Sequence, residues 1–536
     1  MTSAQTLSMR PPPARSKPLI LIALLAASFV INLDTTLVNV ALPTLSGELG
    51  ATTAQLQWVV DAYNLVFAAL LLTAGSISDR YGRKGMLLAG LAVFGAASFV
   101  GAYASSPGEL ITARAVMGLG AAMTFPATLS LLTGAFTERN ERALAIGLWG
   151  ATGGAAIALG PIVGGFLLEH YAWSSIFYTL GPVSAAVIAL CAFAIPKSKS
   201  RSAHRLDVAG LVLSSGFMAL LVYTIIEAPG RGWTAPATLL GFAGSVLLLA
   251  ALIFGERRTD QPMLDVRLFS NMRFSAASAS VTIGFFTLNG FIFLMTLFFQ
   301  FVRAYSPLST GVRLLPVAAS VAIGSTVGTR LAVRFGTKAV VTLGLILQGG
   351  FYFWVAGSVS PTFGYGLISV QMVIFGLGMG LTTAPATESI MGAVSAHQAG
   401  VGSAVNDSTR LLGSTLGVAI IGSVYASLYR TRLDAGLPPH LPTQLTDLAH
   451  QSVGAAYGVS GQLAAHGQGV LANTVHQAAT NAFDHGLSIG CVVAGVIALG
   501  GALFAAIFLP AQPPTPPEAP AQQSDSPSIA EGAGTR

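Results

Sequence analysis

The chain has 536 residues, of which 53% are hydrophobic and only 9% are Asp, Glu, Lys or Arg. Soluble domains carry roughly a quarter charged residues, so this composition leaves too little polar surface for a water-soluble enzyme of this length. We therefore expect an integral membrane protein and not an enzyme.

Fourteen apolar runs are long enough to cross a bilayer, which takes about 20 helical residues. The first run follows Arg10, Arg15 and Lys17 as a signal peptide would, but it is too long and contains Asn32 and Asp34, so we expect it to stay attached. Together the runs predict an all-α integral membrane fold with fourteen transmembrane helices. They span about residues 18–43, 57–78, 85–104, 108–135, 142–168, 172–195, 206–227, 235–255, 274–301, 308–333, 338–358, 363–390, 398–428 and 486–509.

The loops between these runs differ in charge. If the N-terminus is cytoplasmic, 20 of the 27 Lys and Arg residues lie on the cytoplasmic side and five on the outside. This asymmetry follows the positive-inside rule and predicts a protein of the cytoplasmic (inner) membrane with both termini in the cytoplasm. The positive residues stand in short groups between apolar runs and form no stripe, so we expect no nucleic-acid partner.

Two sequence elements recur at nearly the same offset. RYGRK at 80–84 is repeated as RFGTK at 334–338, and GLGAAMTFPAT from Gly118 is repeated as GLGMGLTTAPAT from Gly376. Two matches near one offset indicate a duplicated six-helix unit, which leaves the runs 206–227 and 235–255 as an insert. Paired six-helix units are typical of rocking transporters, whose substrate path follows their interface.

The predicted organisation follows from this repeat. It comprises a cytoplasmic N-terminal tail (1–17), a first six-helix domain (18–195), a two-helix insert (206–255), a second six-helix domain (272–509) and a disordered Pro- and Ser-rich cytoplasmic tail (510–536).

An external loop is expected at 430–485. It holds five of the eight His residues. These are irregularly spaced and are not accompanied by Cys or acidic residues at metal-ligand spacing, so a polar loop with weak helical turns is favoured over a metal site. Cys191 and Cys491 lie inside apolar runs without redox or metal-ligand spacing. We predict no bound metal.

A charge inside a span costs at least ~2.5 kcal/mol, so each such residue needs a reason. Asp34, Asp61 and Arg114 all fall in the outer half of the first domain. We interpret Asp34 as the principal proton carrier and Arg114 as the neighbour that biases its protonation; the alternative is a static salt bridge between them. Asp61 either attracts a substrate or a cation, or is a plain interfacial residue.

Two further charges, Asp407 and Arg410, stand three residues apart on the run 398–428. At that spacing they are helical neighbours and could neutralise one another. The functional alternative is that Asp407 faces the cavity from the second domain and helps to hold a cationic substrate. Asp61, Asp407 and Arg410 are thus the candidate substrate-binding residues.

Four segments carry a family resemblance. LDTTLVNVALP (33–43), GSISDRYGRK (75–84), ARAVMGLGAA (113–122) and GLWGATGGAAIALGPIVGG (147–165) stand in the order of known signatures. They resemble the major facilitator superfamily, and within it the fourteen-span drug/proton antiporters of the EmrB/QacA type. The resemblance implies two six-helix halves and proton-coupled export of lipophilic or cationic small molecules, powered by the proton gradient without a cofactor.

The resemblance also implies gating roles. The 75–84 motif would latch the cytoplasmic gate against the start of the run 398–428, and the 147–165 motif would form the seal of an exporter. For the second motif, ordinary packing of small residues is the alternative. The residues concerned are Gly75, Asp79, Arg80, Gly82 and Arg83 in the latch, and Gly160, Pro161, Gly164 and Gly165 in the seal.

The chain departs from the family pattern at several positions. Met117 replaces a usual Gln, Ala156 replaces a usual Gly, and the usual Arg after Trp173 is missing. The run 308–333 carries no acid, which weighs against dicationic substrates.

Three functions stay open at this point. The leading prediction is multidrug export, and the alternatives are a narrow exporter of one metabolite or antibiotic and a non-transporting sensor or scaffold. The partners implied are small molecules, protons and the lipid bilayer; a periplasmic adaptor is an open question.

Overall fold

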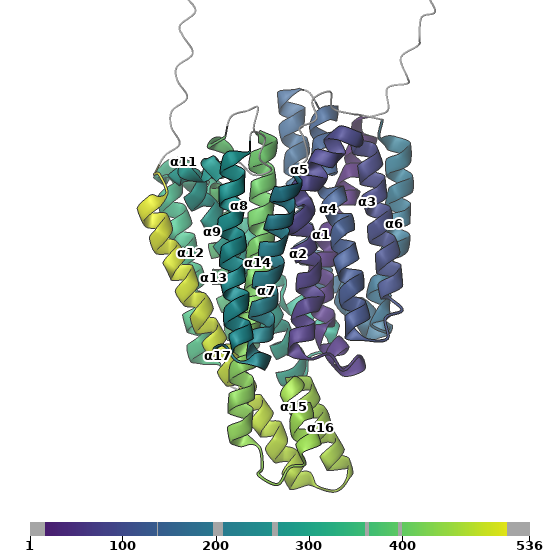
Figure 1. The fold of residues 1–536 in the computed structure, drawn as a ribbon, viewed down its shortest axis with the longest axis vertical. Coiled ribbons are helices and arrows are strands. Elements are labelled where there is room, and N and C mark those ends of the chain that lie inside the picture. The colour runs from purple at the N-terminus through teal and green to yellow at the C-terminus, as the bar shows by residue number, and fades with distance from the viewer. Residues whose placement is uncertain are drawn as a thin grey trace, which may run out of the picture.

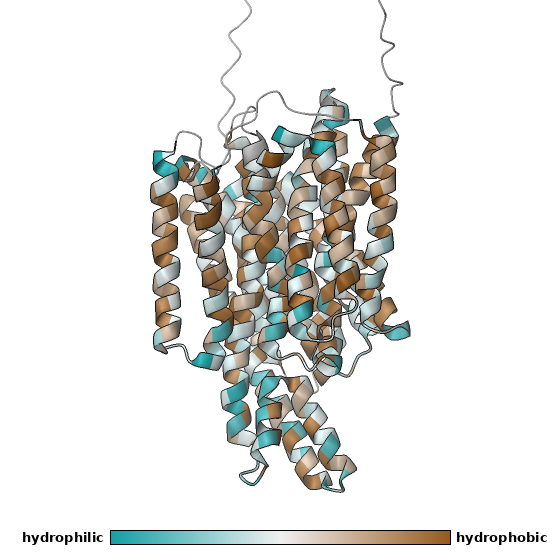
Figure 2. Cartoon of the chain, turned by 45° about the vertical axis from the view of Figure 1, so that its right-hand side comes forward, coloured by the Kyte–Doolittle hydropathy of each residue, from teal (hydrophilic) through white to brown (hydrophobic). Residues whose placement is uncertain are grey.

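The computed structural model describes residues 17–136, 138–196, 207–259, 266–359, 364–394 and 399–511. Within these ranges the chain forms helices and no strands, and fourteen helices are long and apolar enough to cross a membrane. They stand side by side in one bundle (Figure 1), and hydrophobic residues make up most of their length (Figure 2). The predicted all-α fold with fourteen spans is confirmed. The predicted tails lie almost wholly outside the described residues.

Six spans form each of two domains. The N-domain consists of α1 (Lys17–Glu48), α2 (Thr53–Tyr81), α3 (Arg83–Gly101), α4 (Pro107–Ala135), α5 (Arg139–His170) and α6 (Ser174–Ala194). The C-domain consists of α9 (Met272–Leu297), α10 (Pro307–Arg313), α11 (Leu315–Phe335), α12 (Thr337–Ser358), α13 (Tyr365–Gly392), α14 (Ala399–Gly436) and α17 (Gly469–Phe508). We call the end of the bundle where α1 begins and α17 ends the near end, and the opposite end the far end.

The repeat seen in the sequence has matching backbone geometry. Gly82 and Gly336, from the two related motifs, both have positive φ, 121° and 86°, where one helix ends and the next begins. Gly120 on α4 and Gly378 on α13 also correspond: a Cβ added at either would lie 2.7 Å from a backbone oxygen of α3 or α12. Only glycine permits both the dihedral and the close approach. The α3–α4 pair of the N-domain and the α12–α13 pair of the C-domain therefore approach each other in the same way.

One predicted span is interrupted. The run expected at 308–333 is divided at Leu314 into the short α10 and the longer α11. Pro316 lies in the first turn of α11, where the missing N–H does no harm. The break turns α10 into a separate element that packs against α5 of the N-domain.

The insert covers the boundary between the domains. Its helix α7 (Val208–Arg231) packs against α2 and α14, whereas α8 (Pro236–Arg258) packs mainly against α7. Ser423 of α14 donates to the Ile225 carbonyl over 2.9 Å, and Trp58 of α2 donates to Glu227 over 3.4 Å. Thus α7 contacts both domains.

The segment 430–485 is more ordered than the expected loop with weak turns. It contains the far ends of α14 and α17 together with α15 (Thr443–Gln451) and α16 (Val453–Ala465), which project beyond the bundle (Figure 1). Val459, Leu463 and Val475 help to form a small apolar core of its own. This core explains the order, since the helices bury their apolar faces against one another.

Candidate functional site

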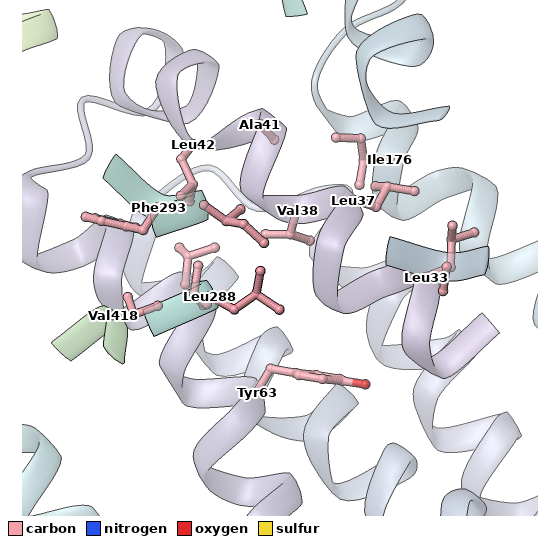
Figure 3. Close-up of a cluster of buried hydrophobic side chains, with 14 of the residues drawn as sticks. Leu33, Leu37, Val38, Ala41, Leu42, Tyr63, Ile176, Leu288, Phe293 and Val418 are labelled. Atoms are coloured by element: carbon pink, nitrogen blue, oxygen red, sulfur yellow. The ribbon is translucent and has the colours of Figure 1, made fainter. Parts of the chain in front are cut away.

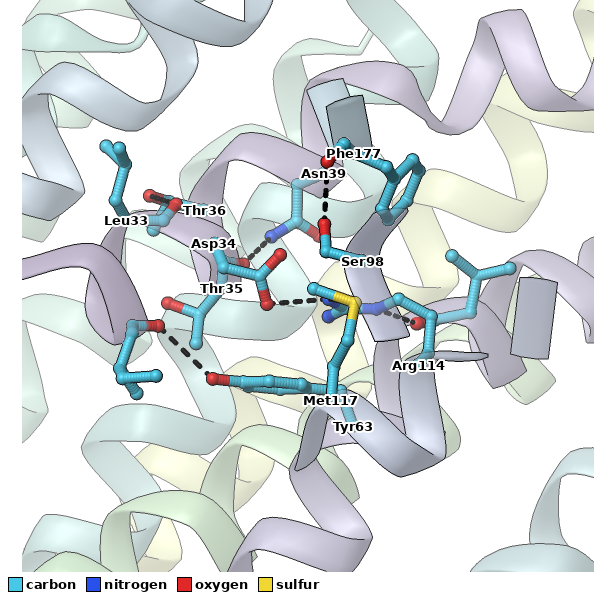
Figure 4. Close-up of polar contacts among 12 residues, drawn as sticks. Leu33, Asp34, Thr35, Thr36, Asn39, Tyr63, Ser98, Arg114, Met117 and Phe177 are labelled. Carbon is cyan, nitrogen blue, oxygen red and sulfur yellow. Dashed lines mark hydrogen bonds and ion pairs between the residues drawn. The ribbon is translucent and has the colours of Figure 1, made fainter. Parts of the chain in front are cut away.

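A buried ion pair joins α1 to α4 inside the N-domain (Figure 4). Arg114 Nη1 donates to Asp34 Oδ2 over 2.6 Å, and the side chains are 1% and 0% exposed. Two charges this deep are retained only when they are paired and hydrogen-bonded. The two proton-coupling candidates therefore lie in direct contact.

Arg114 has two further partners on α2. Its Nε donates to the Val59 carbonyl of α2 over 3.0 Å, and its guanidinium carbon lies 4.3 Å from the centroid of the Tyr63 ring. The Tyr63 hydroxyl in turn donates to the Ile31 carbonyl of α1 over 3.2 Å. Tyr63 thus supports the arginine from α2 (Figure 4). None of these contacts of Arg114 involves the Asp34 carboxyl.

Asp34 itself is only partly bonded. Its Oδ1 atom is buried and has no hydrogen-bond partner among the described residues, whereas Oδ2 is held by Arg114. A buried acceptor without a donor is costly. A proton on Oδ1 would remove that cost, so the carboxyl has one oxygen bound to the cation and one open to a proton.

Asp61 on α2 occupies a different environment. Its side chain is 0% exposed, and neither carboxyl oxygen has a hydrogen-bond partner in the described part of the chain. No described Lys, Arg or His lies within ion-pair distance of it. The structure does not bring Asp61 together with the Asp34–Arg114 pair through any such contact.

Replacing Asp34 and replacing Asp61 with leucine should change the free energy of unfolding very differently. Asp34→Leu leaves Arg114 buried with neither its counter-charge nor the hydrogen-bond acceptor that Asp34 provides, which should cost about 3–5 kcal/mol. Asp61→Leu removes a buried carboxyl that has no described partner, so the change should be close to neutral or stabilising. Thermal unfolding of the purified variants in one detergent checks this contrast. Equal losses for both variants would contradict it.

Asp407 and Arg410 lie on α14 but do not form an ion pair within 4.0 Å. Arg410 Nη2 donates to the Thr387 hydroxyl of α13 over 3.3 Å, and its guanidinium carbon lies 5.4 Å from the centroid of the Phe285 ring. Arg410 also lines a cavity in the near half of the C-domain, and Asp407 is absent from its lining. The spacing of the two residues thus did not predict which one faces the open space.

The glycines of the 147–165 motif face two different partners. A Cβ added to Gly160 or Gly164 would lie 3.2 or 3.0 Å from backbone atoms of Leu37 on α1. On the opposite side of α5, a Cβ at Gly165 would lie 2.5 Å from the Leu308 Cα of α10. Pro161 lies on that same side, since a Cβ at Gly311 would be 2.1 Å from its carbonyl oxygen. The motif therefore places α5 in backbone contact with both α1 and the C-domain.

The 75–84 motif is placed at the near end. Gly75 faces Pro126 of α4 at ordinary contact distance, and Arg83 donates to the Ser130 carbonyl of α4 over 3.4 Å. Arg80 is exposed, Gly82 forms the positive-φ junction described above, and the side chain of Asp79 lies outside the described part. The hydrogen bonds described for this motif stay within the N-domain; the proposed latch to α14 remains a prediction.

The two domains meet through an apolar cluster in the far half of the bundle. Figure 3 shows Leu288 and Phe293 of α9 and Val418 of α14 beside Val38 and Leu42 of α1. All five are 3% exposed or less. Burial of this cluster closes the far side between the domains.

Polar contacts reinforce the same closure. Gln57 of α2 donates to the Val418 and Ala419 carbonyls over 3.0 Å each, and Gln300 donates to the Val40 carbonyl over 2.8 Å. Every hydrogen bond between the two domains whose partners are both described lies in the far half. These glutamines could not be singled out from the sequence, because neutral polar residues are common inside membrane helices.

The histidines do not form a metal centre in the described residues. No group of three or more His, Cys, Asp or Glu side chains that could hold a metal ion occurs there. Instead, His450 Nε2 lies 2.5 Å from Asp434 Oδ1 near the far end of α14.

Comparisons with known proteins agree with this architecture. Residues 24–418 match the family model described as Major Facilitator Superfamily. The chain is 35% identical to the multidrug resistance protein Stp of Mycobacterium tuberculosis, covering 82% of this chain and 81% of that protein. It is 32% identical to the multidrug efflux pump LfrA of Mycolicibacterium smegmatis, covering 88% and 92%.

A solved structure shares the fold. It is a bacterial homologue of the human lysosomal transporter Spinster, with a TM-score of 0.66 at 16% identity over 93% of this chain and 98% of that one. With its fourteen spans and two related six-helix domains, the chain is a multi-pass membrane protein that belongs to the major facilitator superfamily of transporters.

Proposed function

We propose that this transporter exports lipophilic small molecules across the cytoplasmic membrane in exchange for protons, as a multidrug antiporter. The observation that carries the proposal is the buried Asp34–Arg114 pair, a titratable contact that ties α1 to α4. The names of the relatives, a multidrug resistance protein and a multidrug efflux pump, support the direction of transport.

The near end is proposed to face the cytoplasm. The 20 of 27 Lys and Arg residues predicted on that side support this orientation. Because the described hydrogen bonds between the domains lie in the far half, the chain would then be closed toward the outside and open toward the cytoplasm. Labelling of single cysteines introduced at Glu48 and Lys338 tests it: membrane-impermeant reagent added to intact cells should reach only the first.

The proton step follows from the bonding of Asp34. A proton arriving at the open Oδ1 atom neutralises the carboxyl, so that the ion pair with Arg114 becomes a weaker hydrogen bond from the guanidinium to a neutral acceptor. Arg114 stays with α2 through the Val59 carbonyl and the Tyr63 ring. Protonation therefore loosens α1 from its neighbours without displacing the arginine.

A short path links this step to the domain boundary. Two residues after Asp34, Thr36 donates to the Ala156 carbonyl of α5 over 2.9 Å, and the next residue, Leu37, packs against Gly160 and Gly164. The other side of α5 touches α10 of the C-domain. A displacement of α1 would thus reach the contact between the domains through backbone-to-backbone packing, which transmits small movements well.

The driving force is adequate for accumulation. A membrane potential contributes ~2.3 kcal/mol per charge per 100 mV, whereas tenfold accumulation requires ~1.4 kcal/mol. One or two protons per substrate would suffice, and no cofactor is required by this scheme.

The test is proton movement in energised inverted vesicles when candidate compounds are added. Responses to several chemically unrelated lipophilic compounds are expected. A response to a single compound would instead select a narrow exporter, and no response to any cation, dye or antibiotic would point to a sensor or scaffold.

A further inference from the structure

An open cavity lies in the near half of the C-domain, between α11, α13 and α14, and its surface is largely apolar with a few polar groups. Its volume is about 410 Å³, within the range of roughly 300–1,000 Å³ found for small-molecule sites. The charged residues in its lining are Arg410 and Glu388, and the hydroxyls of Ser325, Thr329, Thr383 and Thr387 complete the polar part. The cavity is thus suited to a ligand that carries both signs of charge.

The guanidinium of Arg410 is only partly bonded. Its Nη2 atom reaches the Thr387 hydroxyl at 3.3 Å, but its buried Nε has no hydrogen-bond partner among the described residues. Guanidinium offers five donors in a rigid planar fork, which matches the two oxygens of a carboxylate. The protein leaves most of this fork unused while exposing it to a cavity.

The Asp407 carboxylate does not bond to the free donors of the Arg410 guanidinium. It is a helical neighbour of Arg410, but no nitrogen of Arg410 lies within 4.0 Å of its carboxyl oxygens, and it does not line the cavity. Thr387, the one described hydrogen-bond partner of the Arg410 side chain, also donates to the Asn406 side chain over 3.1 Å. Arg410 is therefore held in position by a neutral group, and no carboxylate bonds its guanidinium in the described part of the chain.

Glu388 supplies the opposite charge at the same cavity. It is exposed near the end of α13. The α11 wall provides only Ser325 and Thr329, without an acid. A substrate with two positive charges would find one acid here beside a cation, whereas a zwitterion would find one partner for each charge.

We propose that this cavity binds amphiphilic substrates that carry a carboxylate beside a cationic group, with Arg410 bonding the carboxylate and Glu388 attracting the cation. The inference rests on the proposed export function, for which it names a substrate class. Because an unpaired buried cation penalises an uncharged ligand group, replacing the carboxylate by an ester should lose the contact with Arg410.

The experiment uses a rhodamine dye with a free carboxylate and the methyl ester of the same dye, which differ by one charge and a methyl group. Binding of both dyes to the full-length purified protein is measured by fluorescence anisotropy without a proton gradient. Arg410→Gln should weaken binding of the acid at least about tenfold, or ~1.4 kcal/mol, and leave the ester unchanged or bound more tightly. Arg410→Lys, which keeps the charge but loses the fork, should weaken the acid by a smaller factor.

Two variants serve as controls. Glu388→Gln should weaken both dyes to a similar degree, since both carry the cationic ring system. Arg432→Gln, an exposed arginine at the far end of the same helix, should change neither. A purely structural role of Arg410 would instead lower the affinity for both dyes together.

The inference is overturned if Arg410→Gln weakens acid and ester equally, if it spares the acid, or if the wild-type protein binds the ester but not the acid. Transport in proteoliposomes separates this from the export proposal. Wild-type protein that binds both dyes with the expected dependence on Arg410 but moves neither one would refute export and support the binding site.

Discussion

Asp34→Asn is expected to abolish proton-driven transport while leaving the protein folded and able to bind substrate. The amide can still accept the hydrogen bond from Arg114, so the geometry between α1 and α4 is preserved. It cannot take up and release a proton in the transport cycle. Since proton transfer by a positioned side chain is typically worth ~100-fold or more, substrate-dependent proton flux in vesicles should fall by at least about that factor.

A matched acid on the same helix provides the control. Glu48 is exposed at the far end of α1, and Glu48→Gln should leave proton flux within about twofold of the wild-type value. Detergent-extracted Asp34→Asn must elute as a single folded species for the comparison to hold. A folded variant that still exchanges protons for substrate would show that Asp34 is not the carrier and that its contact with Arg114 is a static salt bridge.

Gly165→Val is expected to force the domains apart at the far end. The added Cβ would lie 2.5 Å from the Leu308 Cα and 2.6 Å from the Pro307 carbonyl oxygen, both backbone atoms of the C-domain that cannot rotate away. Overpacking of this kind typically costs about 1–3 kcal/mol. If the cost falls only on the state in which α5 and α10 touch, the balance should shift tenfold or more toward the state open at the far end.

Pulsed EPR distances between spin labels at Glu48 and Gln451 measure this shift. The native Cys191 and Cys491 are buried and free and would be replaced by Ala. Gly154 is the control on the same helix, because a Cβ there meets no atom within 4 Å. An unchanged distance distribution in Gly165→Val, or an equal change in Gly154→Val, would show that α5 is not the seal between the domains.

The sequence predicts the membrane spans well because each span needs a long apolar run. Charged residues are costly in lipid and are therefore rare within those runs. The repeat was visible through Gly82 and Gly336, since a positive φ at the helix junction restricts the residue type. In contrast, the helices α15 and α16 were expected as weak turns. Their apolar residues are too few for a membrane span, and packing against α17, against α1 and against one another orders them.

The site was predictable to the extent that burial makes charge costly. Asp34 and Arg114 stood out for that reason, and the structure places them in contact. Spacing along a helix fixes neighbours but not rotamers, so it could not show that Arg410 turns to the cavity instead of pairing with Asp407. Whether the Asp61 carboxyl finds a hydrogen-bond partner depends on the helices that pack against α2. The residue pattern of α2 alone does not encode that packing.

The most direct test of proton antiport uses purified protein in proteoliposomes without any imposed pH gradient. A gradient of a lipophilic dye that the protein transports should by itself drive protons across the membrane in the opposite direction to the dye, and Asp34→Asn should abolish this flux. Dye movement without any pH change in the wild-type protein would contradict proton antiport.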